Sequence, residues 1–499
     1  MAYMNEVQRI DECRVQLRAV GDMKVPVTAF LDDELYALAA GDEPLWRQAA
    51  FMASIDSVQA AHLMPDTHPG YGVPIGAVIV TRDTLALGGA GFDIGCGMVA
   101  MRLLGVTAED LVDPAVRRTW IDEVIKRIPL GIGRHRAELM ESFSSRTVED
   151  VLRNGPGAIG VDTSFCERAR FEVSSVYDPA RIPNVFDKAV AQLGSLGGGN
   201  HFVELLCDED DGQAYAIVHS GSRGYGHDTA DWFFRYDGDE TRGKRDETLT
   251  SAGSAFGREY MDHHNAAANY ASANRWVMYR AIAAASCQTF SDCSPEPIYE
   301  ISHNLVQKEQ VSFDGESWDD AWVHRKGATR AFPSRHPMLA GTRWFNDGHP
   351  IIVPGSMYEG AALLRAMPPR LMQPELTRAY DPAEASEELK DFMWTNSARS
   401  CFSVNHGAGR VMGRMQAKKK RPELGGLKGR GREIDREMRI ITRTLGGVEV
   451  VGVLSNHRQI PLDECRHVYK QLDPVLNTLV RAGICEVEHR LWPVANVKG

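Results

Sequence analysis

Five residues spread along the chain carry the side chains that a transition metal would need. Asp93 and Cys96 share a glycine-rich turn, while His201, His219 and His303 each lie in or beside a glycine turn or a strand end. A carboxylate, a thiolate and imidazoles suit manganese, iron, cobalt or zinc better than calcium. Because these residues are far apart in the sequence, they predict a catalytic centre assembled from distant strands and not a zinc finger. The alternative is a buried cysteine with several hydrogen-bonded core histidines.

Three further glycine-bearing turns, 197–200, 354–357 and 407–409, could bind a phosphate through backbone N–H groups. None has the sequence of a Walker P-loop, and no GxGxxG opens a helix with an acid downstream. His406 stands directly before the third turn and Arg410 directly after it. An accessible imidazole beside a cation is what a histidine nucleophile attacking a phosphate requires. Each turn taken alone is weak evidence, and a plain polar loop is then the favoured interpretation.

Basic residues are concentrated in the stretch that follows His406. They are Arg410, Arg414, residues 418–421, Lys428, Arg430 and Arg432. The net charge of -11 and the pI of about 5.8 exclude a uniformly basic protein that coats nucleic acid. A local cluster in an acidic chain predicts a track for a nucleic-acid backbone, and a solvated loop is the other interpretation.

The composition is that of a globular protein, with 499 residues, 43% hydrophobic and 25% charged, enough to bury a large core. The nine cysteines are odd in number and include no CxxC pair, so a disulfide framework is not expected and a reducing cytoplasm is. The first residues include acids and no apolar run, and no stretch of about eighteen apolar residues occurs. We therefore expect neither a signal peptide nor a membrane span.

Strands and helices are predicted to alternate without a regular βαβ rhythm, which favours an α+β fold over a doubly wound sheet. Apolar runs predict strands at 75–80, 98–104 and 448–454, among others. The spacing of apolar residues predicts helices at 32–41, 46–58, 108–128, 251–286 and 466–481. Two prolines and two glycines predict a loop at 64–72, and the Pro-, Glu- and Ala-rich stretch 366–391 predicts an insertion or exposed excursion.

Nine segments, taken together and in order, resemble the RtcB family of RNA-splicing ligases. They are MPDTHPGYGVPIG, GGAGFDIGCG, LGSLGGGNHFVEL, VHSGSRGYGH, SHNLV, HRKGATRAFP, PGSM, NHGAGR and the terminal Val-Lys-Gly. No single segment is decisive, but nine in the family's order are very specific, and they extend from residue 64 to the last residue. The resemblance implies a single large α+β catalytic domain of the family's own architecture, with a central metal site.

The resemblance also implies a chemistry for these residues. It makes Asp93, Cys96, His201, His219 and His303 the ligands of one or two Mn²⁺ ions, and GTP the energy source. His406 becomes the histidine that is covalently guanylylated. The residues implied around the guanylate are Asn200, His201, Phe202, Val203, Glu204, His303, Asn304, Pro354, Gly355, Ser356, Met357, His406, Gly407, Ala408, Gly409, Tyr469 and Lys498. Arg223 and Arg410 are implied to steady phosphates, and Asp66 to act as an acid in a later step.

The implied reaction joins an RNA 3′-phosphate, or a 2′,3′-cyclic phosphate opened first, to a 5′-hydroxyl, in tRNA splicing or RNA repair. Whether the reaction needs an activating protein partner is left open. The chain departs from the family at Val404-Asn405 before the histidine and at Tyr-Glu-Gly-Ala after Met357. A guanylyltransferase that caps ends without ligation, and a divergent paralogue with another substrate, are therefore alternatives. An RNA-binding module without catalysis is a further one, against which the intact His406 and five ligand candidates argue.

Overall fold

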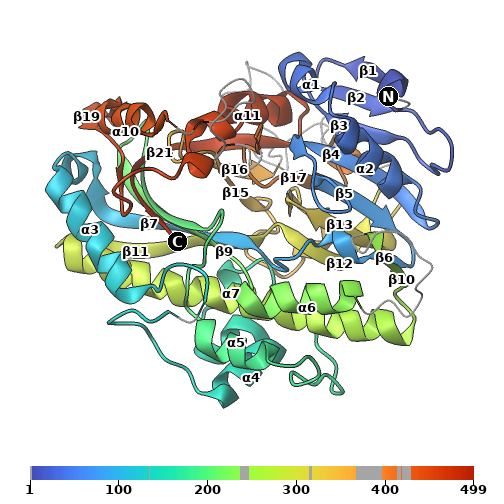
Figure 1. Cartoon of the computed structure of the whole chain (residues 1–499), viewed down its shortest axis with the longest axis horizontal. Coiled ribbons are helices and arrows are strands. Elements are labelled where there is room, and N and C mark those ends of the chain that lie inside the picture. The colour runs from blue at the N-terminus through green and yellow to red at the C-terminus, as the bar shows by residue number, and fades with distance from the viewer. Residues whose placement is uncertain are drawn as a thin grey trace.

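The computed structural model describes residues 3–133, 135–235, 247–313, 317–366, 396–412, 417, 427 and 429–499. In this part of the chain, helices and strands are mixed, and most strands belong to two large sheets that lie side by side (Figure 1). Strand pairing is mostly antiparallel, and no run of βαβ units builds either sheet. The predicted α+β class is confirmed.

The first sheet has seven strands and carries the N-terminal part of the chain. Its order is β1 (Val7–Asp11), β2 (Arg14–Leu17), β3 (Val27–Phe30), β4 (Val58–His68), β5 (Ile75–Thr81), β13 (Asp319–Lys326) and β12 (Asn304–Val311). Helices α1 (Asp33–Ala39) and α2 (Glu43–Ala53) bury their apolar faces against it. Each helix starts at an aspartate, Asp32 or Asp42, whose carboxylate accepts a backbone N–H of the first turn.

The second sheet has eight strands and carries the predicted metal ligands. Its order is β11 (Ser294–Ser302), β7 (Gly97–Thr107), β9 (Gln213–Ser220), β8 (Phe202–Asp208), β21 (Cys485–Lys498), β16 (Ala361–Ala366) and β15 (Pro350–Pro354), with β20 (Leu454–Ser455) beside β21. Both of its faces are covered. On β8, Val203 and Leu205 join one apolar cluster and Phe202 and Leu206 join another. This alternation explains why the strand is apolar throughout.

One long helix, α7 (Ala255–Thr289), runs beneath the strands of both sheets (Figure 1). Ser254 caps it by accepting the Gly257 N–H. Its alanines allow the close packing that leaves most of its central turns buried. The buried Arg275 on this helix forms an ion pair with Glu300 of β11 and donates to the carbonyls of Gly95 and Ser220. The helix therefore fixes the turns from which the predicted ligands project.

Smaller elements complete the described part. The helices are α3 (Pro114–Arg127), α4 (Ser145–Asn154), α5 (Val185–Gln192), α6 (Arg223–Arg235), α10 (Gly431–Ile440) and α11 (Leu472–Arg481). Paired short strands are β6 (Thr84–Ala86) with β10 (Leu249–Ser251), β14 (Ala328–Arg330) with β17 (Ser403–Asn405), and β18 (Thr442–Leu445) with β19 (Val448–Val451). None of the helices among the described residues is long and apolar enough to cross a membrane.

Several predicted boundaries are wrong in the structure. Residues 64–68 form the end of β4 and not a loop, and Pro65 is accommodated where the pairing of β4 with β5 shifts register. The helix predicted over 46–58 ends at Ala53, and the helix predicted over 108–128 is a short 3₁₀ turn followed by α3. The helix predicted from residue 466 begins at Leu472. Apart from Ala366, the last residue of β16, the predicted excursion lies outside the described residues.

Candidate active site

Strand register brings the five predicted metal ligands to one end of the eight-stranded sheet. His219 on β9 pairs with Met98 of β7 on one side and with Phe202 of β8 on the other. Cys96 directly precedes β7, and His201 directly precedes β8. His303 follows β11, whose Ser302 pairs with Gly97. Residues far apart in the sequence, such as Cys96 and His303, are thus adjacent because their strands end at the same level.

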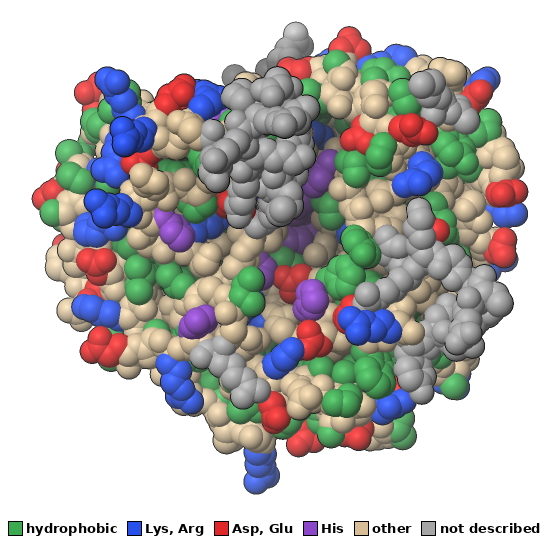
Figure 2. Space-filling model, viewed as in Figure 1, with side chains coloured by type: hydrophobic (Ala, Val, Ile, Leu, Met, Phe, Trp, Pro, Cys, Tyr) green, Lys and Arg blue, Asp and Glu red, His purple; other side chains and the backbone are tan. Residues whose placement is uncertain are grey.

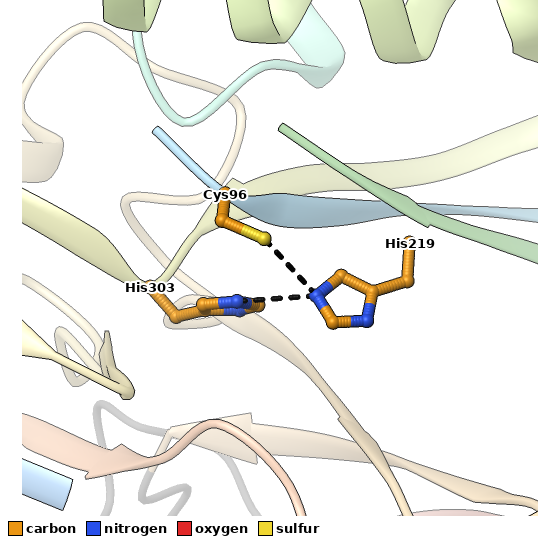
Figure 3. Close-up of side chains that lie close together, drawn as sticks. All are labelled: Cys96, His219 and His303. Atoms are coloured by element: carbon orange, nitrogen blue, oxygen red, sulfur yellow. Dashed lines mark hydrogen bonds between the residues drawn. The ribbon is translucent and has the colours of Figure 1, made fainter. Parts of the chain in front are cut away.

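Three of these side chains converge on one point (Figure 3). Cys96 Sγ lies 3.3 Å from His219 Nε2, and His219 Nε2 lies 3.2 Å from His303 Nε2. All three residues are buried. Burial, together with the surrounding positive charge, holds the pKa values of His219 and His303 well below the ordinary value, so both imidazoles are neutral. A neutral imidazole keeps a lone pair for a metal.

Asp93 and His201 form a second group with the same cysteine. His201 Nε2 lies 2.9 Å from Asp93 Oδ2 and 3.5 Å from Cys96 Sγ. The other ring nitrogen, Nδ1, donates to the Leu196 carbonyl at 2.9 Å, and the Ser222 N–H holds Asp93 Oδ1 at 3.1 Å. Such outer contacts fix the orientation of metal ligands. The structure therefore places all five predicted ligands in two overlapping groups that share Cys96.

These donor atoms fit a divalent transition metal. Two nitrogen ligands about 2.1 Å from a tetrahedral metal are about 3.4 Å apart, close to the separations seen here. Nδ1 of His201 carries the ring proton and donates a hydrogen bond to the Leu196 carbonyl. The lone pair on Nε2 therefore faces the Asp93 carboxylate and the Cys96 sulfur atom. Several electron-rich donor atoms thus lie close together with few N–H or O–H groups between them, and a bound cation would satisfy them. The mixture of thiolate, imidazole and carboxylate excludes calcium as the preferred ion.

Gly95 and Arg275 hold the Asp93–Cys96 turn in place. Gly95 has φ +72°, and a side chain there would lie 2.9 Å from the Ala271 Cβ of α7. Arg275 donates to the Gly95 carbonyl at 2.6 Å. The sequence alone does not identify Arg275 as a residue of the site. Its only signal there is one arginine within a run of small and apolar residues that the helical pattern places in the core.

His406 lies between this cluster and a cavity. It follows β17, whose Asn405 pairs with Ala328 of β14, and its ring centroid lies 4.9 Å from that of His303. His406 Nδ1 lies 2.8 Å from the Gly327 carbonyl oxygen and 2.6 Å from Asp66 Oδ2. Since both neighbours are acceptors, the proton of the neutral ring belongs on Nδ1 and the lone pair on Nε2.

Asp66 is completely buried behind His406. Apart from the His406 ring, no hydrogen-bond donor reaches either of its carboxylate oxygens within the described residues. Gly409 has φ +75°, and a side chain there would overlap the Asp66 carbonyl. The close approach of these two segments therefore requires glycine. The structure thus places Asp66 beside the His406 ring, a position that the family resemblance alone did not specify.

The cavity beside His406 has a volume of about 280 Å³. Its lining includes most of the residues predicted around the guanylate, namely Asn200, Phe202, Glu204, Pro354, Gly355, Ser356, Met357, His406, Gly407, Ala408, Gly409, Tyr469 and Lys498, together with Arg410 and the metal-ligand candidate His219. Figure 2 shows histidine side chains gathered in a hollow near the centre of this face. The remaining lining residues, His68, Ile75 and Glu464, were not predicted.

Other predicted residues lie outside the cavity wall. His201 and His303 belong to the metal cluster, and Val203 points to the opposite face of β8. Asn304 bridges two turns, since its side chain donates to the Asp93 carbonyl and accepts the Gly327 N–H. Arg223 donates to Ser195 and to the Gly131 carbonyl, beside Gly197. A role of Arg223 on a phosphate stays a prediction.

Two segments of the sequence are rich in basic residues, HRKGATR and the cluster after His406, and the structure describes the second only in part. In the HRKGATR segment, Arg325 forms a two-bond ion pair with Glu309 and Arg330 pairs with Glu167, so both guanidinium groups are used internally. Of the cluster after His406, Arg410, Arg430 and Arg432 are described. The positions at 414, 418–421 and 428 lie outside the described residues, and the nucleic-acid track stays a prediction.

Comparison with known proteins gives the family. The sequence model described as tRNA-splicing ligase RtcB matches residues 48–372 and 393–499. A tRNA-splicing ligase RtcB of Thermococcus kodakarensis is 29% identical, with 100% of each chain covered. One of Archaeoglobus fulgidus is 30% identical over 96% of this chain and 95% of its own, and an RNA-splicing ligase RtcB of Mycobacterium tuberculosis is 29% identical over 89% and 97%. With a family match over most of its length, this chain belongs to the RtcB family of tRNA-splicing ligases.

Proposed function

We propose that this chain is a GTP- and Mn²⁺-dependent RNA ligase that joins RNA 3′-phosphate or 2′,3′-cyclic phosphate ends to 5′-hydroxyl ends. The observation that carries the proposal is the position of His406, which lines the cavity with one edge and contacts the metal-ligand candidate His303 with its ring. Family membership supports the ligase class. The nine free cysteines support a reducing, cytoplasmic setting.

His406 acts as the nucleophile in this proposal. Its Nε2 lone pair attacks the α-phosphorus of GTP, a nitrogen–phosphorus bond forms, and the bond to the β-phosphate oxygen breaks with loss of pyrophosphate. Positive charge develops on the ring during attack. The buried Asp66 carboxylate, 2.6 Å from Nδ1, stabilises that charge and keeps the ring in the reactive tautomer.

The metal cluster and the cavity divide the remaining tasks. Asp93, Cys96, His201, His219 and His303 would hold one or two Mn²⁺ ions, and a bound ion would supply positive charge for the phosphate oxygens. On the other side, Tyr469 offers a ring for stacking on guanine, and Glu204 and Lys498 offer an acceptor and a donor for its edge. The RNA 3′-phosphate then takes the guanylate from His406, and the 5′-hydroxyl displaces GMP.

The choice of RNA ends tests the proposal. Given GTP and Mn²⁺, the protein should seal a 3′-phosphate end to a 5′-hydroxyl end and leave a 3′-hydroxyl/5′-phosphate pair unjoined, because the proposed reaction transfers the guanylate to a 3′-phosphate and needs a 5′-hydroxyl to displace GMP. Gel separation of the two labelled substrate pairs measures this. Sealing of the 5′-phosphate pair alone would exclude the proposed reaction. A guanylate-capped 3′ end that never ligates would instead favour end capping.

Recognition of the base should depend on pH through Glu204. Burial raises the pKa of this carboxyl to about 7, although the Lys498 charge and the Asn496 hydrogen bond oppose the rise. A protonated carboxyl cannot accept both edge N–H groups of guanine, so affinity should increase as pH rises through 7. Each pH unit below that value should weaken binding about tenfold.

Guanosine is the probe for this measurement because it carries no phosphate that titrates near neutral pH. Calorimetry between pH 5.5 and 8.5 should give a rising affinity for the parent protein and a flat profile for Glu204→Gln. Equal slopes in the two proteins would show that another group controls recognition.

A further inference from the structure

Glu464 is a buried carboxylate in the cavity wall that contacts three other lining residues. Its Oε2 accepts hydrogen bonds from Tyr469 Oη at 2.6 Å and from Lys498 Nζ at 2.7 Å. Its Oε1 lies 3.6 Å from Arg410 Nη1. Only 3% of Glu464 and 5% of Lys498 are exposed. One side chain therefore joins three residues that come from separate parts of the sequence.

Two of these residues, Arg410 and Tyr469, also contact each other. Arg410 Nη1 donates to Tyr469 Oη at 3.0 Å, and its guanidinium carbon lies 4.9 Å from the centre of the Tyr469 ring. The backbones are joined as well, since Val411 N–H donates to the Val468 carbonyl and Lys470 N–H to the Gly409 carbonyl. Arg410 also donates to the Asp463 carbonyl. One side of the cavity wall is therefore held together by a network of hydrogen bonds and ion pairs.

Electrostatics explains why a carboxylate is needed at this point. Two cations, Arg410 and Lys498, face one region of low exposure, and a buried positive charge without a counter-charge is costly. Charge-assisted hydrogen bonds are short and directional, so the Glu464 carboxylate also fixes where the Lys498 ammonium and the Tyr469 ring point. The Phe202 ring, whose centre lies 5.5 Å from Lys498 Nζ, restricts the movement of the ammonium group on the side away from Glu464.

We infer that Glu464 is a positioning residue for base recognition, which holds Tyr469 and Lys498 in the arrangement that a guanine base requires. The inference rests on the proposed function and deepens it. The side-chain contacts described for Glu464 go to Tyr469, Lys498 and Arg410, which are neither the nucleophile candidate His406 nor metal-ligand candidates. Glu464 should therefore govern the affinity and the selectivity for GTP and leave the chemical step at His406 unchanged.

Single-turnover kinetics of covalent labelling by GTP and by ATP, with Mn²⁺ present, tests this; kcat denotes the maximal labelling rate constant and KM the nucleotide concentration that gives half of it. In Glu464→Gln, the KM for GTP should rise about tenfold while kcat stays within about twofold, because the binding that is lost is the same in the ground state and in the transition state. The preference for GTP over ATP should fall with it. Glu464→Asp, which keeps the charge on a shorter side chain, should recover part of the lost affinity.

A double-mutant cycle with Tyr469→Phe adds a second readout. Tyr469→Phe removes the hydrogen bond that Glu464→Gln deprives of its charge, so their effects on KM should be clearly less than additive. Glu433→Gln is the matched control, since Glu433 pairs with Arg430 on α10 and does not line the cavity. It should match the parent protein. If Glu464→Gln does not fold, as judged by its melting curve, Glu464→Asp and Tyr469→Phe carry the comparison.

The outcomes separate the inference from the proposed function. A parent protein that takes no label from GTP would overturn both. A parent that is labelled, with a Glu464→Gln variant of unchanged KM and unchanged selectivity, would overturn the inference alone. A variant that loses kcat at constant KM would also overturn it, because Glu464 would then act on the chemistry at His406.

Discussion

Replacing His406 with alanine is expected to abolish covalent labelling of the protein by GTP. The side chain lies between the cavity and the metal cluster, where a nucleophile could reach the phosphate of a bound nucleotide. Loss of a nucleophile lowers catalysis by at least about 10⁴-fold. Labelling with GTP carrying a radioactive α-phosphate, followed by denaturing electrophoresis and peptide mass spectrometry, measures both the loss and the site.

The stability of the label identifies the bond. A phosphate joined to an imidazole nitrogen is cleaved in acid and survives alkali, so the label on the parent protein should be lost at low pH only. His227→Ala is the matched control, because the His227 side chain is 59% exposed and does not line the cavity. A label that resists acid, or one that persists in His406→Ala, would assign the nucleophile to another side chain.

The part of the site that the sequence predicted consists of residues marked by their immediate neighbours. Cys96 follows Gly95, and one residue separates His201 from the glycines 197–199; both precede apolar strands, so both could be placed at strand ends without a structure. The α+β class followed from the mixture of helical and strand periodicities. In both cases the signal is local, because glycine and residue spacing act on the backbone within a few positions.

The rest depends on contacts between distant segments. Asp66 lies beside His406 because Gly409 lets the two chain segments approach closely. Glu464 lies in the cavity wall because the segment that contains it pairs with the segment around Arg410. The family segment around Asp66 marked that residue but not its place beside His406, and Glu464 has no distinguishing neighbour in the sequence. The same limit explains the error at 64–68, where prolines and glycines suggested a loop. Pairing with β5 continues the strand as far as His68.

Replacing Cys96 with alanine should abolish tight metal binding and, with it, labelling by GTP. Cys96 belongs to both groups of candidate ligands, so its loss removes one donor from each. The cost in metal affinity should exceed the 10- to 100-fold that changes to outer contacts produce. Metal content after dialysis against Mn²⁺, measured by mass spectrometry, reports this independently of activity.

Proton release gives a second test of the same site. Burial and the neighbouring Asp93 hold the pKa of the Cys96 thiol well above its ordinary value, so the metal-free protein carries the protonated thiol. A bound cation requires the thiolate, and metal binding should therefore release a proton from the parent protein and not from Cys96→Ala. Calorimetry in two buffers of different ionisation enthalpy measures the number of protons.

Cys207→Ala is the matched control, because Cys207 is equally buried in the same sheet, and its thiol contacts only the Gly212 carbonyl among the hydrogen bonds described. Both variants lose a buried sulfur atom and should melt at similar temperatures without metal. Only Cys96→Ala should lose Mn²⁺ and the guanylate label. A Cys96→Ala protein that binds manganese and reacts with GTP as the parent does would place the metal elsewhere, and the strand ends that meet at His219 would then have a structural role alone.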